Sequence, residues 1–535
     1  MPARSEASVK RLTLIACILG SGIALLDGTV VNVALPTIQR ALGGGLAAQQ
    51  WVVNGYLLTL GSLILVGGSL GDIYGERRIF ALGVSLFGLA SLACALAPTI
   101  GWLIAARILQ GVASALLTPA SLAVIVHTFP ESERGGAIGA WTAWGTIAAV
   151  IGPLLGGELL AIGSWRWIFV INVPLVIVCV WIILVAIPRA PPRETASRRV
   201  DLTGAVLCAS GLGGIVFALI EQPRLGWSSP AELVALLGGV ALLAAFIVHE
   251  SRTRDPMLPL RLFSKRNFTA GNLETFSMYA GLAILFFFLI LFLQQIAGYS
   301  PLKSGLTTLP VTVVMFALSR RFGALADRYG PRLFMGLGPL LCAAGLLLLQ
   351  RVGTHVDYLT DLLPALLVFA LGLSMTVAPL TAAVLAEAAQ LDAGIASGVN
   401  NAIARVAGLI GTAAVGAAVA GSFAADLDRR LAGVRLGPPA RAAVAQVKRL
   451  SLGRPEVHGV PPRQARAVTS AAEAASVHSF HLGMAIAAAL LALGGLIGAL
   501  GIRNRHGVVA AEHCPAGQFV GTGRELAEAA SGGPG

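Results

Sequence analysis

Residues 68–77 read GSLGDIYGER, and residues 323–332 read GALADRYGPR. The two stretches share Gly, Leu, Asp, Tyr, Gly and Arg in the same order and spacing, so six of ten positions are identical. Each is a polar interruption between long apolar segments. This internal repeat predicts a chain built from two related halves, with the repeated loop in the same place in each half.

The composition indicates a membrane protein. Of 535 residues, 56% are hydrophobic and 12% charged, with a mean hydropathy of +0.80. A soluble globular protein carries about 25% charged residues. The apolar residues come in segments of about 20, the length that crosses roughly 30 Å of hydrocarbon as a helix.

The apolar segments bounded by charged residues, proline or glycine clusters predict fourteen membrane-spanning helices in an all-α protein. We expect them near 12–35, 50–71, 79–98, 101–126, 136–161, 167–188, 201–221, 230–249, 270–297, 305–326, 332–352, 360–386, 397–422 and 479–502.

The basic residues predict which side each loop occupies. Lys and Arg are concentrated in loops 72–78, 189–200, 250–266 and 327–332, as expected for loops retained in the cytoplasm. The even number of spans then puts both termini in the cytoplasm. We expect the chain to lie in the cytoplasmic (inner) membrane. The arginine-rich stretch 423–478 would be a long extracytoplasmic loop, and its length approaches that at which loops translocate largely irrespective of charge.

The spans also divide the chain. Because the repeated loops follow the second and tenth spans, an even number of crossings separates them and both face the same side. Two six-helix bundles would separate them by only six crossings, so two further helices are inserted between the halves. We therefore expect an N-terminal bundle at 1–188, a linker with two additional helices at 189–266, a C-terminal bundle at 267–503, and a disordered cytoplasmic tail at 504–535.

Six motifs in this order resemble the fourteen-helix drug:proton antiporters of the major facilitator superfamily. They are LDGTVVNVALP (26–36), GSLGDIYGERR (68–78), ARILQGVASA (106–115), GPLLGG (152–157), WRWIFVINVP (165–174) and NNAIARVAGLIGTA (400–413). The resemblance implies two helical bundles that rock about a central site, and export of drugs, antibiotics or other toxic amphipathic molecules in exchange for protons.

Among the charged residues inside apolar spans, two suggest a functional pair. Asp27 interrupts the first span, and an ionisable side chain at that depth is a functional hypothesis by default. Arg107 lies at a similar depth in the fourth span. A neighbouring arginine favours an ionised carboxylate, so motion that separates the pair could couple proton transfer to transport. The alternatives are a structural aspartate and an arginine that extends to the interface.

Two further groups are carried by the motifs. We expect the repeated loops to form a cytoplasmic gate in which acidic and basic side chains latch onto helix ends, the alternative being a simple topology anchor; its residues are Gly68, Asp72, Gly75, Arg77, Arg78, Asp327 and Arg332. The small residues Gly152, Pro153, Gly156 and Gly157 allow close helix packing. That this element marks an exporter is implied by the resemblance alone.

The remaining polar, aromatic and sulfur-containing residues in the spans could line a pocket for lipophilic ligands. They are Asn32, Gln110, Trp141, Trp144, Met278, Met375 and Arg405. We expect no metal and no cofactor, because the six cysteines are isolated, no cluster has metal-ligand spacing, and no GxxxxGK[ST] nucleotide-binding loop occurs.

The expected partners are a small-molecule substrate, protons and the lipid bilayer, with the chain a monomer. The net charge of +12 is spread among loops and does not indicate nucleic-acid binding. The alternative functions are a dedicated exporter of one endogenous metabolite or antibiotic and a symporter for uptake. A membrane enzyme or a sensor is disfavoured because the loops carry no cluster of carboxylates, histidines or cysteines.

Overall fold

A computed structural model describes residues 6–188, 200–386 and 393–504, and within them the chain is helical without a strand. Most of the expected tail at 504–535 and of the loop at 189–200 lies outside the described residues. Within these described ranges, thirteen helical segments have the length and hydropathy to cross a bilayer. Helix α5, with 32 residues, is long enough to be a fourteenth.

The N-terminal half is one bundle of helices. It contains α1 (Glu6–Leu42), α2 (Leu46–Tyr74), α3 (Glu76–Ala95), α4 (Ile100–Thr128), α5 (Glu131–Ile162), α6 (Trp167–Val170) and α7 (Asn172–Ala186). Helix α4 begins where the sequence supplies a cap, because the side chain of Thr99 accepts a hydrogen bond from the backbone of Trp102.

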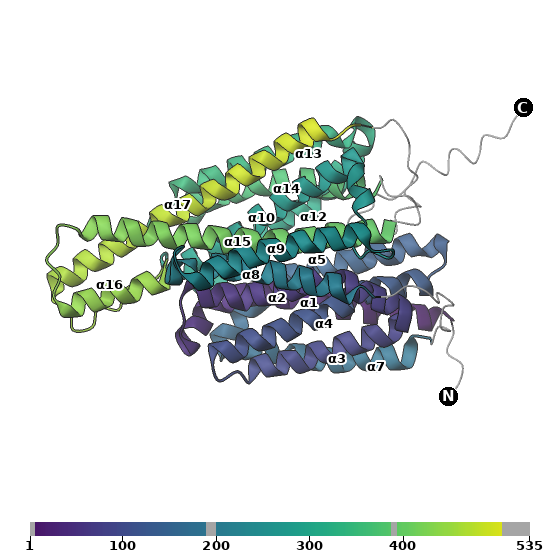
Figure 1. Ribbon diagram of the computed structural model, residues 1–535, viewed down its shortest axis with the longest axis horizontal. Helices are drawn as coiled ribbons and strands as arrows, with labels where there is room; N and C mark the ends of the chain where they lie inside the picture. Colours follow the sequence, from purple (N-terminus) through teal and green to yellow (C-terminus); the bar gives the residue numbers. More distant parts are fainter. Residues whose placement is uncertain (1–5, 189–199, 387–392, 505–535) are drawn as a thin grey trace, which may run out of the picture.

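The C-terminal half repeats this arrangement above it in Figure 1. It contains α10 (Arg266–Gln295), α11 (Pro301–Thr307), α12 (Leu309–Tyr329), α13 (Pro331–Leu348), α14 (Leu363–Leu385), α15 (Ala393–Leu431), α16 (Pro438–Leu450) and α17 (Pro462–Gly501). Short turns of helix lie at Leu260–Ser264, Leu349–Arg351 and Tyr358–Leu362.

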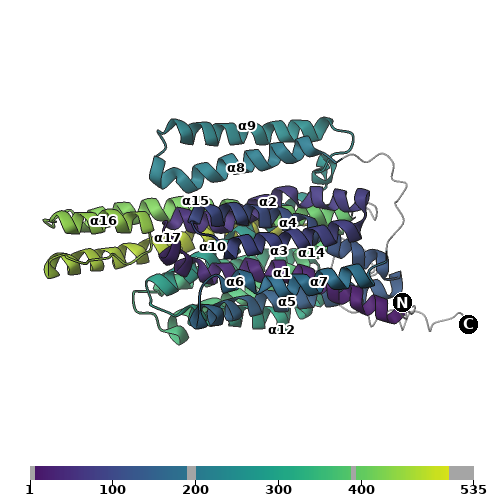
Figure 2. The same cartoon turned by 90° about the horizontal axis from the view of Figure 1, so that it is seen from below.

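The two inserted helices lie on the side of the bundle. Helix α8 (Leu202–Leu225) packs against α2 of one half and α15 of the other, and α9 (Pro230–Arg252) covers the outer side of α8. Figure 2 shows this pair as a separate layer beside the main bundle. Residues Val216 and Ile220 of α8 pack with Leu409 of α15, so the insertion bridges the halves.

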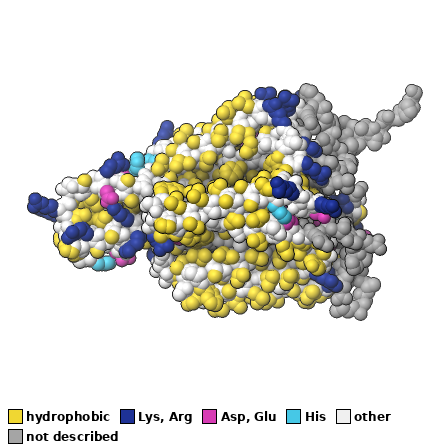
Figure 3. Space-filling view, viewed as in Figure 1, with side chains coloured by type: hydrophobic (Ala, Val, Ile, Leu, Met, Phe, Trp, Pro, Cys, Tyr) yellow, Lys and Arg dark blue, Asp and Glu magenta, His cyan; other side chains and the backbone are white. Residues whose placement is uncertain are grey.

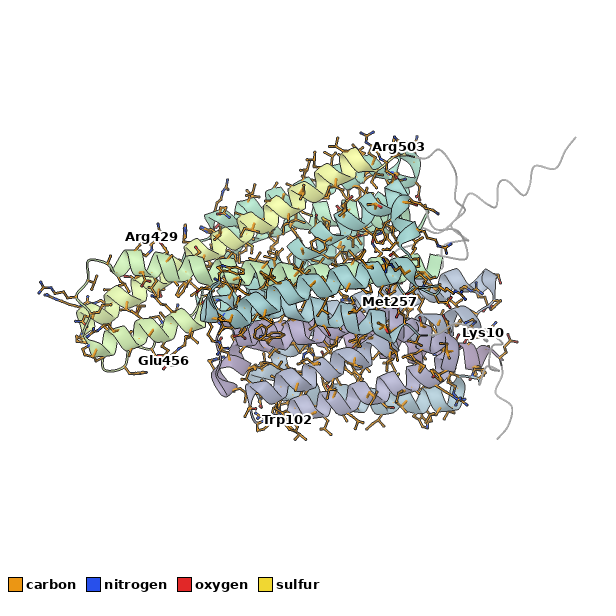
Figure 4. The ribbon with its side chains drawn as sticks, viewed as in Figure 1. Lys10, Trp102, Met257, Arg429, Glu456 and Arg503 are labelled. Carbon is orange, nitrogen blue, oxygen red and sulfur yellow. The ribbon has the colours of Figure 1, made fainter. Side chains whose placement is uncertain are left out.

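The surface has the polarity that a bilayer requires. In Figure 3 hydrophobic side chains cover the middle of the visible face, and Lys and Arg gather at its two ends. Figure 4 places Lys10 and Arg503 at one end and Arg429 and Glu456 at the other. Both ends of the described chain therefore lie on one side of the molecule, which we call the terminal end, and the opposite side is the far end.

The stretch 423–478 differs from the expected loop, because much of it is helical. Helix α15 continues to Leu431, α16 covers Pro438–Leu450, and α17 begins at Pro462. At about 1.5 Å per residue, the 39 and 40 residues of α15 and α17 extend well beyond a 30 Å hydrocarbon layer. This protrusion at the far end has its own small core, which includes Phe423, Val447 and Val468.

The hydrophobic cores show how the halves meet. A large core toward the far end joins α1 of the N-terminal half to α10 and α17 of the C-terminal half. Within the C-terminal half, Phe292 of α10 and Phe480 of α17 stack with their ring centroids 4.4 Å apart. Toward the terminal end each half has its own core, around Phe80 in one and Phe268 in the other. The halves therefore share one large core at the far end, whereas toward the terminal end they have separate cores and meet where α2 and α15 pack, as at Leu65 and Gly398.

Candidate functional site: a central cavity and a buried ion pair

A cavity of about 1580 Å³ lies between the two halves. Its walls come from α1, α2 and α4 on one side and from α10 and α15 on the other. Asp72, His127 and Arg254 line it at the terminal end, and Arg107 and Thr412 line its deep part. The cavity thus extends from the terminal end to the middle of the molecule.

Hydrogen bonds between the halves close the molecule beyond the cavity. Gln294 of α10 donates to the carbonyl of Val33 at 2.9 Å, and Gln50 of α2 donates to the carbonyl of Thr412 at 2.6 Å. The Thr412 hydroxyl donates to Asn54 Oδ1 at 2.9 Å. These bonds, together with the shared core, hold the far end shut.

The base of the cavity is backed by a buried ion pair. The guanidinium of Arg107 contacts the carboxylate of Asp27, and the two side chains are 1% and 0% exposed. Arg107 also donates to Gln110 Oε1 at 2.6 Å and to the carbonyl of Val52 at 3.1 Å, and it lies over the ring of Tyr56 at 4.4 Å from its centroid. Only Arg107 of the pair reaches the cavity wall.

Neutral donors complete the environment of the carboxylate. Gln110 Nε2 donates to Asp27 Oδ1 at 3.0 Å, and Asn172 Nδ2 donates to the same oxygen at 3.1 Å. Asn172 also donates to the hydroxyl of Ser91 at 2.9 Å. A buried ion pair is tolerated only when further hydrogen bonds satisfy its atoms, and here α2, α4 and α7 supply them.

The arrangement keeps a carboxylate and a guanidinium in contact directly behind the cavity wall. No group of three or more His, Cys, Asp or Glu side chains that could hold a metal ion occurs in the parts of the chain that the structure covers.

The sequence is similar to those of a known protein family. The sequence profile of the Major Facilitator Superfamily matches residues 17–412, which is most of the chain. The chain belongs to the major facilitator superfamily.

Its relatives include proteins named for drug resistance. The puromycin resistance protein pur8 of Streptomyces alboniger is 39% identical over 76% of this chain and 81% of its own length. The multidrug resistance protein Stp of Mycobacterium tuberculosis is 33% identical over 90% of both chains. The methylenomycin A resistance protein of Bacillus subtilis is 34% identical over 77% of this chain and 88% of its own length.

Solved structures agree on the fold. A bacterial homologue of the human lysosomal transporter Spinster, in an inward-facing and unoccupied conformation, superposes with a TM-score of 0.61 at 17% identity, covering 91% of this chain and 97% of that one. At this identity the match supports the major facilitator fold and nothing finer.

The repeated loops of this superfamily member have equivalent contacts in the two halves. Gly75 and Gly330 have φ of 91° and 86°, which favour glycine. Arg77 then donates to the carbonyl of Leu184, at the end of α7, at 2.7 Å, and Arg332 donates to the carbonyl of Ala499, at the end of α17, at 2.6 Å. In each half the arginine caps the last helix of the bundle.

The other residues expected in the gate lie at the same end. Asp72 and Gly68 line the mouth of the cavity. Asp72, Arg78 and Asp327 are exposed, and the structure does not bring the two aspartates of the repeat together in any contact that it records.

The small residues of α5 lie between the two halves. A Cβ on Gly152 would meet Thr29 Oγ1 of α1 at 2.0 Å, and one on Gly157 would meet the Cα of Leu302, in α11, at 2.5 Å. Gly156 faces Val30, and the carbonyl of Pro153 lies against Gly305. The motif therefore connects the helix that carries Asp27 to the closed far end.

The residues expected in the pocket divide into three groups. Asn32, Trp141 and Arg405 line the cavity, whereas Gln110 is a ligand of the Asp27 carboxylate. Trp144 is 55% exposed on α5, Met278 is buried in the core between the halves, and Met375 packs near Gly338 of α13. None of these last three lines the cavity.

Three residues around the ion pair were not predicted from the sequence: Tyr56, Ser91 and Asn172. They are uncharged and stand in apolar stretches that read as ordinary spans. Asn172 offered a signal, because it is the only amide side chain in the motif WRWIFVINVP that opens α6 and α7.

Proposed function

We propose that this protein exports amphipathic small molecules, including drugs and antibiotics, across the cytoplasmic membrane in exchange for protons. The observation that carries the proposal is the buried Asp27–Arg107 pair at the base of a large cavity between two halves. The names of the relatives, which refer to resistance to puromycin, methylenomycin A and many drugs, favour export as the direction.

The proposed transport cycle follows from the positions of the ion pair, the cavity and the closed far end. With both termini in the cytoplasm, the conformation described above is open to the cytoplasm, and cargo enters it while Asp27 is paired with Arg107. When the far side opens, a proton reaches Asp27 and weakens the pair. Because α1 packs through Thr29 and Val30 on the glycines of α5, a shift of α1 is passed to the contact between α5 and α11, which closes or opens the far end.

The proton gradient supplies the energy. A transmembrane potential contributes about 2.3 kcal/mol per elementary charge per 100 mV, and the pH gradient adds to it.

The test uses everted vesicles that contain the protein and an imposed pH gradient, acid inside. Addition of puromycin, methylenomycin A or another transported compound should dissipate the gradient, and Asp27→Asn should abolish this response because the amide takes up no proton. The matched control is Asp255→Asn, an exposed aspartate at the cavity mouth, which should respond normally. A fully active Asp27→Asn protein would exclude Asp27 from proton coupling.

A further inference from the structure

Arg405 of α15 is a charged side chain of the cavity wall that has no partner. It is half-buried, and it forms no hydrogen bond or ion pair within the described parts of the chain. Arg107, the other arginine at this depth, is neutralised by Asp27. A guanidinium offers five donors in a fixed fork, and those of Arg405 are left for water or for the cargo.

The deep part of the cavity has no acidic group to balance Arg405. Asp27 is fully buried behind the wall, and both of its oxygens already accept hydrogen bonds. The acidic side chains that do line the described cavity, Asp72, Asp201, Glu250 and Asp255, belong to the ends of α2, α8 and α9 and the segment after α9, at the mouth. The deep part of the cavity therefore carries a net positive charge, and the mouth carries charges of both signs.

The surroundings of Arg405 suit a molecule with an apolar body. Tyr279, Leu282 and Phe286 of α10 line the same cavity. On the opposite side, a Cβ on Gly61 of α2 would lie 3.2 Å from Arg405 Cβ, so the arginine stands where the two halves meet. A cargo bound there would touch both halves at once.

We propose that Arg405 is a specificity-determining residue that recognises an anionic group, such as a carboxylate, on an aromatic cargo, so that the transporter prefers amphipathic anions to cations. The planar fork of arginine matches a carboxylate through two charge-assisted hydrogen bonds. A cationic cargo would meet a positive charge that no acidic side chain in the deep part of the cavity balances, and the two like charges would repel each other.

The preference, which rests on the proposed function, also fits the energetics of export. Exchange of one monoanion for one proton moves two charge equivalents in the direction that an inside-negative potential favours. Each contributes through the same potential, so an anion is a cargo that proton exchange can expel against a steep gradient.

The test measures binding to the full-length protein in lipid nanodiscs with three matched probes: pyrenebutyrate, its methyl ester and pyrenebutyltrimethylammonium. The anion should bind at least about tenfold more tightly than the cation, the range expected for a hydrogen-bonded charge pair. Arg405→Gln should remove this preference, and Arg405→Glu should reverse it. Arg441→Gln, which changes an exposed arginine of α16 in the protrusion, away from the cavity, is the matched control and should keep it.

The outcomes separate the two proposals. Equal binding of anion and cation by the unchanged protein, or a preference that survives in Arg405→Gln, would overturn the role of Arg405. If Arg405→Gln fails to fold, two measurements remain. The unchanged protein should bind the acid more tightly than its methyl ester, and Arg405→Lys, which keeps the charge, should retain the preference for the anion with weaker affinity. An anion preference in a protein that moves no protons in everted vesicles would support Arg405 and reject proton-coupled export.

Discussion

The carboxylate of Asp27 is surrounded by protein groups in place of water. One oxygen contacts Arg107, and the other accepts from Gln110 and Asn172. Because Gln110 also bonds Arg107 at 2.6 Å, the donors form one network rather than separate contacts. The network therefore ties Asp27 of α1 to side chains of α4 and α7.

Asn172 provides a test of this network. Asn172→Ala removes a donor from both Asp27 and Ser91, and the loss of one hydrogen bond to a charged group costs about 1.5–3 kcal/mol. We expect proton-driven export to slow by about tenfold or more, while exchange of labelled for unlabelled cargo, which needs no net proton movement, continues. Reconstituted vesicles measure both rates.

The control for this variant is Asn272→Ala, which removes a buried asparagine of α10 that donates to the carbonyl of Phe268 and has no recorded contact with Asp27. It should lower both rates equally or neither. Equal loss of both rates in Asn172→Ala would mean that Asn172 supports the fold and not the proton step.

At this scale the sequence predicted the charged residues better than the neutral ones. A charge inside an apolar span is conspicuous because its burial is costly, so Asp27 and Arg107 stood out. Ser91, Asn172 and Tyr56 are ordinary residues of such spans, and their roles depend on rotation and tilt of α3, α7 and α2 that the sequence does not specify.

Among the elements, α5 links the ion pair to the far end. Its glycines approach α1 on one side and α11 on the other so closely that a Cβ at Gly157 would overlap the backbone of Leu302. Backbone cannot move aside as the end of a flexible side chain can. The contact between α5 and α11 is therefore sensitive to a single added side chain.

Gly157→Val should accordingly keep the far end from closing. We expect the population to shift toward a state open at that end, with export slowed because the state open at the terminal end is disfavoured. Spin labels at Ile162 and Lys303, exposed positions on the two sides of the contact, should report a longer distance by pulsed electron resonance.

Gly139→Val is the matched control on the same helix, because a Cβ there meets nothing within 4 Å. It should leave the distance between the labels unchanged. An unchanged distance in Gly157→Val would show that α11 can move aside to accommodate the added side chain. The GPLLGG motif of α5 would then have no part in closing the far end.

The spans themselves were predictable from the sequence, since length and apolarity decide whether a helix can cross a bilayer. The protrusion was not. The turn between α15 and α16 and the helix after it carry Arg435, Arg441 and Lys448 among alanines, so they have low hydropathy and resemble a loop. Their helical structure depends on packing between Val447 and Val468, residues far apart in the sequence.

For the molecule as a whole, the two-halves architecture requires equivalent loops to lie on one side of the membrane. Both repeated loops meet the ends of helices at the terminal end, and the protrusion projects from the far end. Cysteines introduced at Arg78 and Arg328 should therefore react with an impermeant maleimide in everted vesicles, and one at Gly433, in the turn after α15, should react only in right-side-out cells. All three positions are exposed.

The background for this labelling is low. Cys17, Cys94, Cys179 and Cys342 are buried and Cys208 is half-buried, so they should react slowly, and Cys514, which lies outside the described residues, is replaced by serine. Reaction of Arg78→Cys and Arg328→Cys from opposite sides would contradict a pair of parallel halves. Without parallel halves there is no shared cavity that opens to each side in turn, and exchange of cargo for protons would lose its structural basis.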